Sequence, residues 1–173
     1  MKILVATKQE YDLAKKYLPD FNIMRIGVGA SNVIRACSTI DRHEKIVNIG
    51  FAGSNTLPKG IVTTVFRSFR QLEKHMTGVI EEDYRQGYIL SDDGYDCYTS
   101  NSFVIESDCV NPVLYDMELN YIVAFPFEML GAIKIVSDNL NLEQYETSVN
   151  NSEEEIWDRV KELLFSMLQP LNE

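Results

Sequence analysis

The first 50 residues alternate apolar runs with helical patterns, and this alternation constrains the fold more than any other feature. Residues 2–6 are apolar without polar alternation, which is typical of a strand covered on both faces, and residues 22–26 and 45–50 read as further strands. Between them, two segments place apolar residues at helical spacing, the first with Thr7 as a candidate N-cap. Strand, helix, strand, helix, strand at this spacing predicts βαβ units and an α/β fold with a parallel or mixed sheet.

Later segments add short strands and one clear helix. The expected strands cover residues 61–66, 87–90, 95–98, 102–105 and 132–136, with a hairpin turn at Asp93-Gly94. A helical segment is expected from about Asp116 to a stop at Gly131, followed after the next strand by a polar loop over residues 139–151. The last helix begins with Ser152 and Glu155 at capping-box spacing, and it carries an apolar stripe of Ile156, Val160, Leu163, Leu164, Met167 and Leu168. Without a repeat or linker, residues 1–173 are expected to form one domain.

Charge and composition argue against several functions. The net charge of -10 leaves no basic excess with which to bind nucleic acid or an anionic membrane. No apolar run approaches the roughly 20 residues of a membrane span. Cys37, Cys97 and Cys109 lack CxxC spacing, and the two histidines lie far apart, so neither disulfides nor a zinc site is expected. We therefore expect a cytoplasmic protein without a metal or other cofactor.

Two glycine-containing stretches suit ligand binding, although each has a purely structural interpretation. Gly27-Val28-Gly29 lies between a predicted strand and helix, where backbone N–H groups approach a phosphate or ribose. Position 32 is Asn rather than the third glycine of the dinucleotide fingerprint, so a tight turn between strand and helix is the favoured interpretation of this stretch taken alone. Residues 48–53 place Gly50 and Gly53 at a strand end, which either leaves backbone open to a flat ligand or allows elements to pack closely.

A third feature is a pair of carboxylates, Glu118 and Asp138. The first lies in Tyr115-Asp116-Met117-Glu118, at the head of the predicted helix, and the second closes the strand that ends in Ser137. Ligands of α/β sheets bind outside the carboxyl ends of the strands, so both carboxylates are candidates for one cleft. Taken singly, Glu118 simply favours the helix macrodipole and Asp138 simply caps a turn.

The segments GVGA, VNIGFAG, NSFV, DMEL and IVSD occur in this order, and together they resemble the nucleoside phosphorylase/nucleosidase family. The resemblance is greatest to the methylthioadenosine/S-adenosylhomocysteine nucleosidases and futalosine hydrolases. The opening MKILVATKQE is similar to the family's first strand and acid-bearing loop, so the resemblance spans nearly the whole chain. It implies a three-layer α/β/α fold with a central mixed, mostly parallel twisted sheet. It also implies a homo-oligomer, usually a dimer.

The resemblance implies a small-molecule nucleoside as the partner and assigns its contacts. Phe103 would stack on the purine, and the backbone of Val104 would meet the purine edge. Met117 would pack under the ribose, while Glu118 would accept the protons of its 2′- and 3′-hydroxyls. Further substrate contacts are expected at Ala52, Gly53 and Lys134, the last of which replaces an arginine of the family and loses its bidentate geometry.

The resemblance also implies three catalytic residues. Asp138 would donate a proton to N7 of the leaving purine, and Ser137 would orient it. Glu10 would position and activate the attacking water, with Asp12 as the alternative for this role. These residue types suit the chemistry: a carboxylate stabilises the oxocarbenium-like transition state, and general-acid help is typically worth about 10²–10⁴ in rate. For this role Asp138 must hold a proton near neutral pH.

Three functions remain open from the sequence. The leading hypothesis is an N-glycosyl hydrolase that cleaves a purine nucleoside, or its 5′-thio derivative, to free base and sugar. Phosphorolysis is the alternative reaction; residues 27–32 contain no cation for the phosphate, although Arg67 and Arg70 are candidates from a neighbouring loop. A non-catalytic nucleoside-binding protein is the third possibility, because Lys134 departs from the family pattern and the region around residues 70–100 is shorter than in most members.

Overall fold

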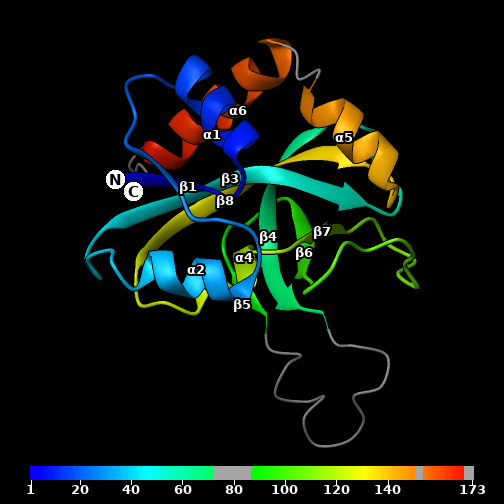
Figure 1. The fold of residues 1–173 in the computed structure, drawn as a ribbon, viewed down its shortest axis with the longest axis horizontal. Helices are drawn as coiled ribbons and strands as arrows, with labels where there is room; N and C mark the ends of the chain where they lie inside the picture. Colours follow the sequence, from blue (N-terminus) through cyan, green and yellow to red (C-terminus); the bar gives the residue numbers. More distant parts are fainter. Residues whose placement is uncertain (72–86, 151–153, 170–173) are drawn as a thin grey trace, which may run out of the picture.

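Strand β3 (Lys45–Ser54) lies at the centre of the fold in the computed structural model, which describes residues 1–71, 87–150 and 154–169 (Figure 1). On one edge β3 pairs in parallel with β1 (Lys2–Val5), which in turn pairs with β2 (Ile23–Arg25). On its other edge it pairs in parallel with β8 (Glu128–Asp138). β1 and β8 therefore flank β3, and the carboxyl ends of all three strands lie on the same side of the sheet.

Five strands close into a barrel-like ring. From β8 the ring continues through β4 (Val62–Arg70), β6 (Tyr95–Thr99) and β7 (Leu114–Asp116) back to the end of β3. The mixed α/β class is confirmed, but the sheet closes into a barrel-like ring and is not clearly the central, mostly parallel sheet of the expected three-layer α/β/α arrangement. β4 follows β3 through the turn at Gly60 without a crossover helix, so it returns antiparallel beside β8. Ala52 and Gly53 of β3 oppose Val136 and Asp138 of β8, so Ser137 is the extra residue of a bulge in β8.

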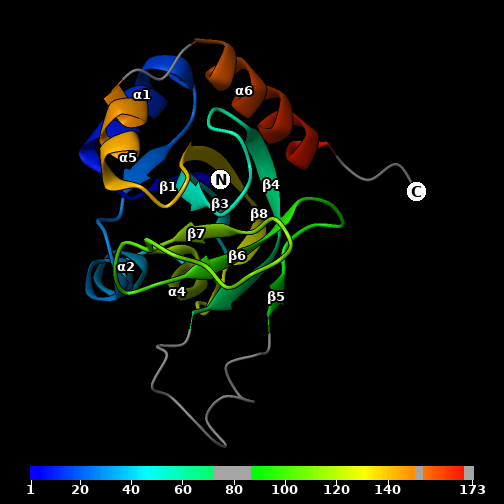
Figure 2. The same cartoon turned by 90° about the vertical axis from the view of Figure 1, so that its right-hand side faces the viewer.

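Helices cover the sheet from two sides (Figures 1 and 2). One side carries α1 (Lys8–Tyr17), α5 (Leu142–Asn150) and α6 (Glu154–Leu168). The other carries α2 (Ala30–Cys37) and the short α4 (Leu119–Val123). No helix within the described ranges is long and apolar enough to cross a membrane.

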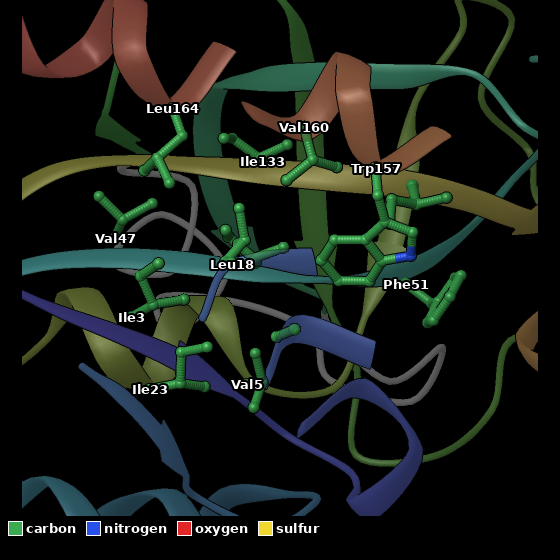
Figure 3. Packing of buried hydrophobic residues seen from close by; sticks show 13 residues of the cluster. Ile3, Val5, Leu18, Ile23, Val47, Phe51, Ile133, Trp157, Val160 and Leu164 are labelled. Carbon is green, nitrogen blue, oxygen red and sulfur yellow. The ribbon is translucent and has the colours of Figure 1, made fainter. Parts of the chain in front are cut away.

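The largest core cluster lies between α6 and the strands. From α6, Val160 lies beside Ile133 of β8 and Trp157 lies beside Phe51 of β3, while Leu164 extends toward Val47 at the other end of the cluster (Figure 3). The predicted apolar stripe is confirmed at Val160 and Leu164, where burial of each side chain stabilises the fold by about 1.5–3 kcal/mol. Leu168, at the end of the predicted stripe, is exposed instead. A second cluster fills the ring and includes α4, and a third lies between α2 and the opposite face of β1.

Several local predictions are wrong, for identifiable reasons. The expected hairpin does not form, because β5 (Tyr88–Ile89) and β6 both pair with β4 and lie on opposite edges of it. Residues 102–105 form an extended loop rather than a strand. The helix expected from Asp116 begins at Leu119, because residues 114–116 complete the ring as β7. Gly131 lies within β8 rather than ending a helical segment.

The expected polar loop over residues 139–151 contains helix α5. Asn141 caps it: its side-chain Oδ1 accepts the N–H of Gln144 at 3.0 Å and its carbonyl accepts the N–H of Tyr145 at 3.1 Å. The capping role expected for Ser152 lies outside the described residues. The position of α5 matters for function, because this helix directly follows Asp138.

Candidate active site

Glu10 is held at the junction of β1 and α1 by three backbone N–H groups. Thr7 caps α1 as predicted, and the Glu10 side chain accepts the backbone N–H of Thr7, which completes a capping box. Glu10 Oε2 accepts from Ala6 at 2.9 Å and Thr7 at 2.7 Å, while Oε1 accepts from Phe51 of β3 at 2.8 Å. The carboxylate is therefore fixed at the carboxyl ends of β1 and β3.

Glu118 joins the glycine-rich turn to the end of β7. Its Oε1 accepts the N–H of Gly29 at 3.2 Å, and its Oε2 accepts the N–H of Met117 at 3.3 Å. Burial, reinforced by the negative charge of Asp116, raises the pKa of Glu118 to about 8, although Lys134 opposes the shift. The turn that the sequence singled out thus binds a carboxylate of the protein, and this carboxylate is largely protonated at neutral pH.

Asp138, the last residue of β8, is fully buried. Its Oδ2 lies 2.7 Å from Ser137 Oγ, and its Oδ1 accepts the N–H of Asn141 at 3.2 Å. Ser137 Oγ also reaches the carbonyl of Ala52 at 3.2 Å. The Ser137 hydroxyl can donate to Asp138 Oδ2 when Asp138 is ionised. When Asp138 is protonated, the hydroxyl can donate to the carbonyl of Ala52 and accept from Asp138.

The two glycines of residues 48–53 make room for these carboxylates. A Cβ at Gly50 would lie 3.0 Å from Glu10 Oε1, and a Cβ at Gly53 would lie 2.9 Å from Asp138 Oδ1. Close packing of elements, the structural interpretation of these glycines, is thus confirmed, and the packed groups are the candidate catalytic side chains.

A small cavity of about 30 Å³ lies beside Asp138. Gly53, Phe103, Val104 and Met117 line it together with Asp138, so the structure brings these five predicted site residues together. The cavity is too small for a purine, and a base can enter only if side chains such as Phe103 move.

Lys134 lies beneath the site rather than at its surface. Its Nζ bonds Asp116 Oδ2 at 2.6 Å, and both side chains are buried. Burial alone would lower the pKa of Lys134, but the carboxylate of Asp116 outweighs this and raises it. Thr99 Oγ1 and the N–H of Leu119 also donate to Asp116, at 2.6 and 3.0 Å. The burial of Lys134 does not favour the predicted substrate contact, because the ammonium group is engaged and covered.

Other predicted residues also lie away from the cavity. Ala52 is buried and packs inside the ring. Asp12, the alternative to Glu10, lies on the surface and pairs with Lys8 at 2.5 Å. Arg67, a candidate phosphate ligand, donates two hydrogen bonds to Asp96, at 2.9 and 2.8 Å. These placements favour Glu10 over Asp12.

Tyr145 of α5 is a site residue that the sequence did not suggest. Its ring meets Phe103 edge-on, with centroids 5.9 Å apart. Burial, together with the charges of Glu10, Glu118 and Asp138, raises the pKa of Tyr145 to about 12. The charges of all three carboxylates therefore act on Tyr145, which makes it a further candidate site residue. Recognition of Asn141 as a helix cap would have placed Tyr145 on the first turn after Asp138.

Comparison with known proteins identifies the fold. No protein-family model and no curated protein sequence matches the chain. Solved structures do match: an MTAN from Chlamydia trachomatis bound to MTA has 14% identity and a TM-score of 0.70, covering 96% of both chains. An S-adenosylhomocysteine nucleosidase from Streptococcus pyogenes has 17% identity and a TM-score of 0.68, covering 98% of this chain and 97% of that one.

The futalosine hydrolase of Helicobacter pylori is similar in the same way. It has 13% identity and a TM-score of 0.65, and the match covers 96% of each chain. All three similarities extend over nearly the full length of both chains, with the ring and both helical layers included. The family resemblance drawn from the ordered motifs is confirmed at the level of structure: the chain has the fold of the nucleosidases that act on methylthioadenosine, S-adenosylhomocysteine or futalosine.

Proposed function

We propose that the protein hydrolyses the N-glycosidic bond of a purine nucleoside to free base and sugar. The observation that carries this proposal is the cavity that Asp138 shares with Phe103, Val104 and Met117, with the carboxylates of Glu10 and Glu118 each fixed by backbone N–H groups. Three carboxylates held apart by separate backbone contacts suit three separate tasks on one ligand. The similarity to structures solved with MTA and with adenine supports a nucleoside as that ligand.

Glu118 and Met117 hold the ribose, and Phe103 and Val104 hold the base. Both carboxylate oxygens of Glu118 already accept backbone N–H groups, so the side chain is oriented before substrate binds. Ribose hydroxyls that donate to it favour its ionised form. The resulting negative charge stabilises the positive charge that develops on the sugar as the glycosidic bond breaks.

Asp138 protonates the departing base, and Glu10 activates water. Asp138 lies at the cavity beside Phe103, where the base binds, and Ser137 keeps the carboxyl oriented. Oε1 of Glu10 accepts one N–H, that of Phe51. Its second lone pair is therefore free to accept a proton from the attacking water. Lys134 acts on this chemistry indirectly, by balancing the charge of Asp116 beneath Glu118.

Product analysis tests the proposal against its alternatives. Adenosine, inosine and methylthioadenosine are each incubated with the protein, with and without inorganic phosphate, and the products are separated by chromatography. Free base and free sugar without phosphate support hydrolysis. Base released only when phosphate is present would instead identify a phosphorylase. Bound but uncleaved nucleoside would identify a binding protein.

A homodimer is also part of the proposal, because the family resemblance implies one. Light scattering coupled to size-exclusion chromatography tests it. A mass near twice the 19.8 kDa of one chain is expected, and a mass of one chain would refute it.

A further inference from the structure

A groove of about 700 Å³ is lined in part by Gly27 and Val28, in the same turn as Gly29, whose N–H bonds Glu118. Its walls come from the end of β1, the end of β2 and helix α2, and they include Thr7, Lys8, Arg25, Val28, Asn32 and Arg35. This groove is far larger than the cavity beside Asp138, and none of the roles proposed above uses it.

The groove is cationic in a protein whose net charge is -10. Lys8, Arg25 and Arg35 line it from three different elements. Within residues 1–71, 87–150 and 154–169, Arg25 and Arg35 form no ion pair, whereas Lys8 pairs with Asp12. Two arginines that form no ion pair in the described residues line one groove and make it a candidate anion site, because a guanidinium binds phosphate or carboxylate oxygens in a bidentate manner.

The order of the subsites indicates which part of a ligand reaches this groove, and this step rests on the proposed function. The base lies at Phe103 and Asp138, and the ribose lies at Glu118, which bonds Gly29. Val28, directly before Gly29, is a groove residue. Thr7, whose N–H bonds Glu10, is another. A 5′ substituent that leaves the ribose on the side away from the base therefore enters the groove.

We propose that this groove binds the 5′-phosphate of a nucleoside 5′-monophosphate, and that such a nucleotide is preferred over the uncharged nucleoside. The phosphate takes no part in the chemistry. Water adds to C1′ of the ribose, the bond between C1′ and N9 breaks, and the base leaves with the proton supplied by Asp138. AMP and water thus give adenine and ribose 5-phosphate, and the proton that water loses to Glu10 restores the proton balance.

Binding measurements on Asp138→Asn separate this inference from turnover. Adenosine and AMP, which differ only in the phosphate, are titrated calorimetrically into this variant. AMP is expected to bind at least about tenfold more tightly, since charge-assisted hydrogen bonds are the stronger ones. Adding Arg25→Gln and Arg35→Gln should abolish this preference and leave the affinity for adenosine unchanged. Arg159→Gln, at an exposed site on α6, is the matched control and should change neither affinity.

Each outcome has a distinct meaning. Equal affinity for adenosine and AMP, or a preference that survives the two arginine substitutions, overturns the inference and leaves the proposed function intact. Failure of both ligands to bind overturns both. A third arm supplies wild-type protein with adenosine and inorganic phosphate: formation of ribose 1-phosphate would assign the groove to a phosphate co-substrate and overturn the 5′ assignment. Faster base release from AMP than from adenosine, lost in the arginine variants, supports the inference.

Discussion

The titration of Glu118 gives a sharp prediction about stability. The pKa of this group is raised from 4.5 to about 8 by burial and by Asp116. In the unfolded chain it titrates near 4.5, so between pH 4.5 and 8 the native state keeps a proton that the unfolded state has lost. The free energy of unfolding therefore falls as pH rises through this window. At about 1.4 kcal/mol per pH unit the full shift amounts to about 5 kcal/mol, and water entry at the site reduces the expectation to about 2–5 kcal/mol.

Glu118→Gln removes this titration while keeping the shape of the side chain. Urea unfolding of wild type and variant is measured from pH 5 to pH 9. Relative to wild type, the variant should gain about 2–5 kcal/mol of unfolding free energy between these limits. Glu143→Gln, at an exposed position on α5, is the control and should give a curve parallel to wild type. If the Glu118→Gln curve is also parallel to wild type, the argument for a buried, protonated Glu118 is refuted.

Three further predictions concern the surroundings of the site and the core. Tyr145→Phe should lower kcat/KM for nucleosides by about tenfold with little loss of stability, because it removes a hydroxyl on which the charges of Glu10, Glu118 and Asp138 act. An unchanged kcat/KM would place the hydroxyl outside the reaction. Lys134→Met should lower the free energy of unfolding in urea by about 3–5 kcal/mol, because Asp116 is left buried without its cation. The double variant Lys134→Met/Asp116→Asn should recover most of this loss. Equal losses in the single and double variants would contradict a buried Lys134–Asp116 ion pair. Leu164→Ala should cost about 2–5 kcal/mol, since the side chain is fully buried against the sheet, and a loss below 1 kcal/mol would contradict the packing in Figure 3.

Local signals in the sequence predicted the elements near the N-terminus well. Thr7 and Glu10 are three residues apart, so their capping box depends only on spacing that the sequence displays. The apolar stripe of α6 is equally local, and Trp157 extends it into the core. Helix α5 shows the limit of such signals, because its outer surface is polar and only Asn141 indicates where it begins.

Closure of the ring could not be predicted from the sequence. It depends on the antiparallel pairing of β4 with β8 and the parallel pairing of β6 with β7, and these contacts join residues far apart in the chain. No periodicity specifies which strand lies beside another. The same holds for the bond between Gly29 and Glu118, which spans 89 residues.

Lys134 illustrates a third kind of limit. A lysine within the apolar run of β8 indicates a buried cation that needs an anionic partner. Several carboxylates of the sequence qualified, and only the structure identifies Asp116. The resemblance to the family therefore nominated candidate site residues, but it did not separate those that line the cavity from those that lie away from it.

Base release by Asp138→Asn tests the central claim most directly. Wild type and variant are incubated with methylthioadenosine or adenosine without phosphate, and free base is measured over time, with urea unfolding and nucleoside binding as checks that the variant is folded. The account predicts that the wild type releases base and that Asp138→Asn is slower by about 10²–10⁴ while still binding nucleoside. A variant as fast as the wild type would contradict the assignment of Asp138 as the group that protonates the leaving base.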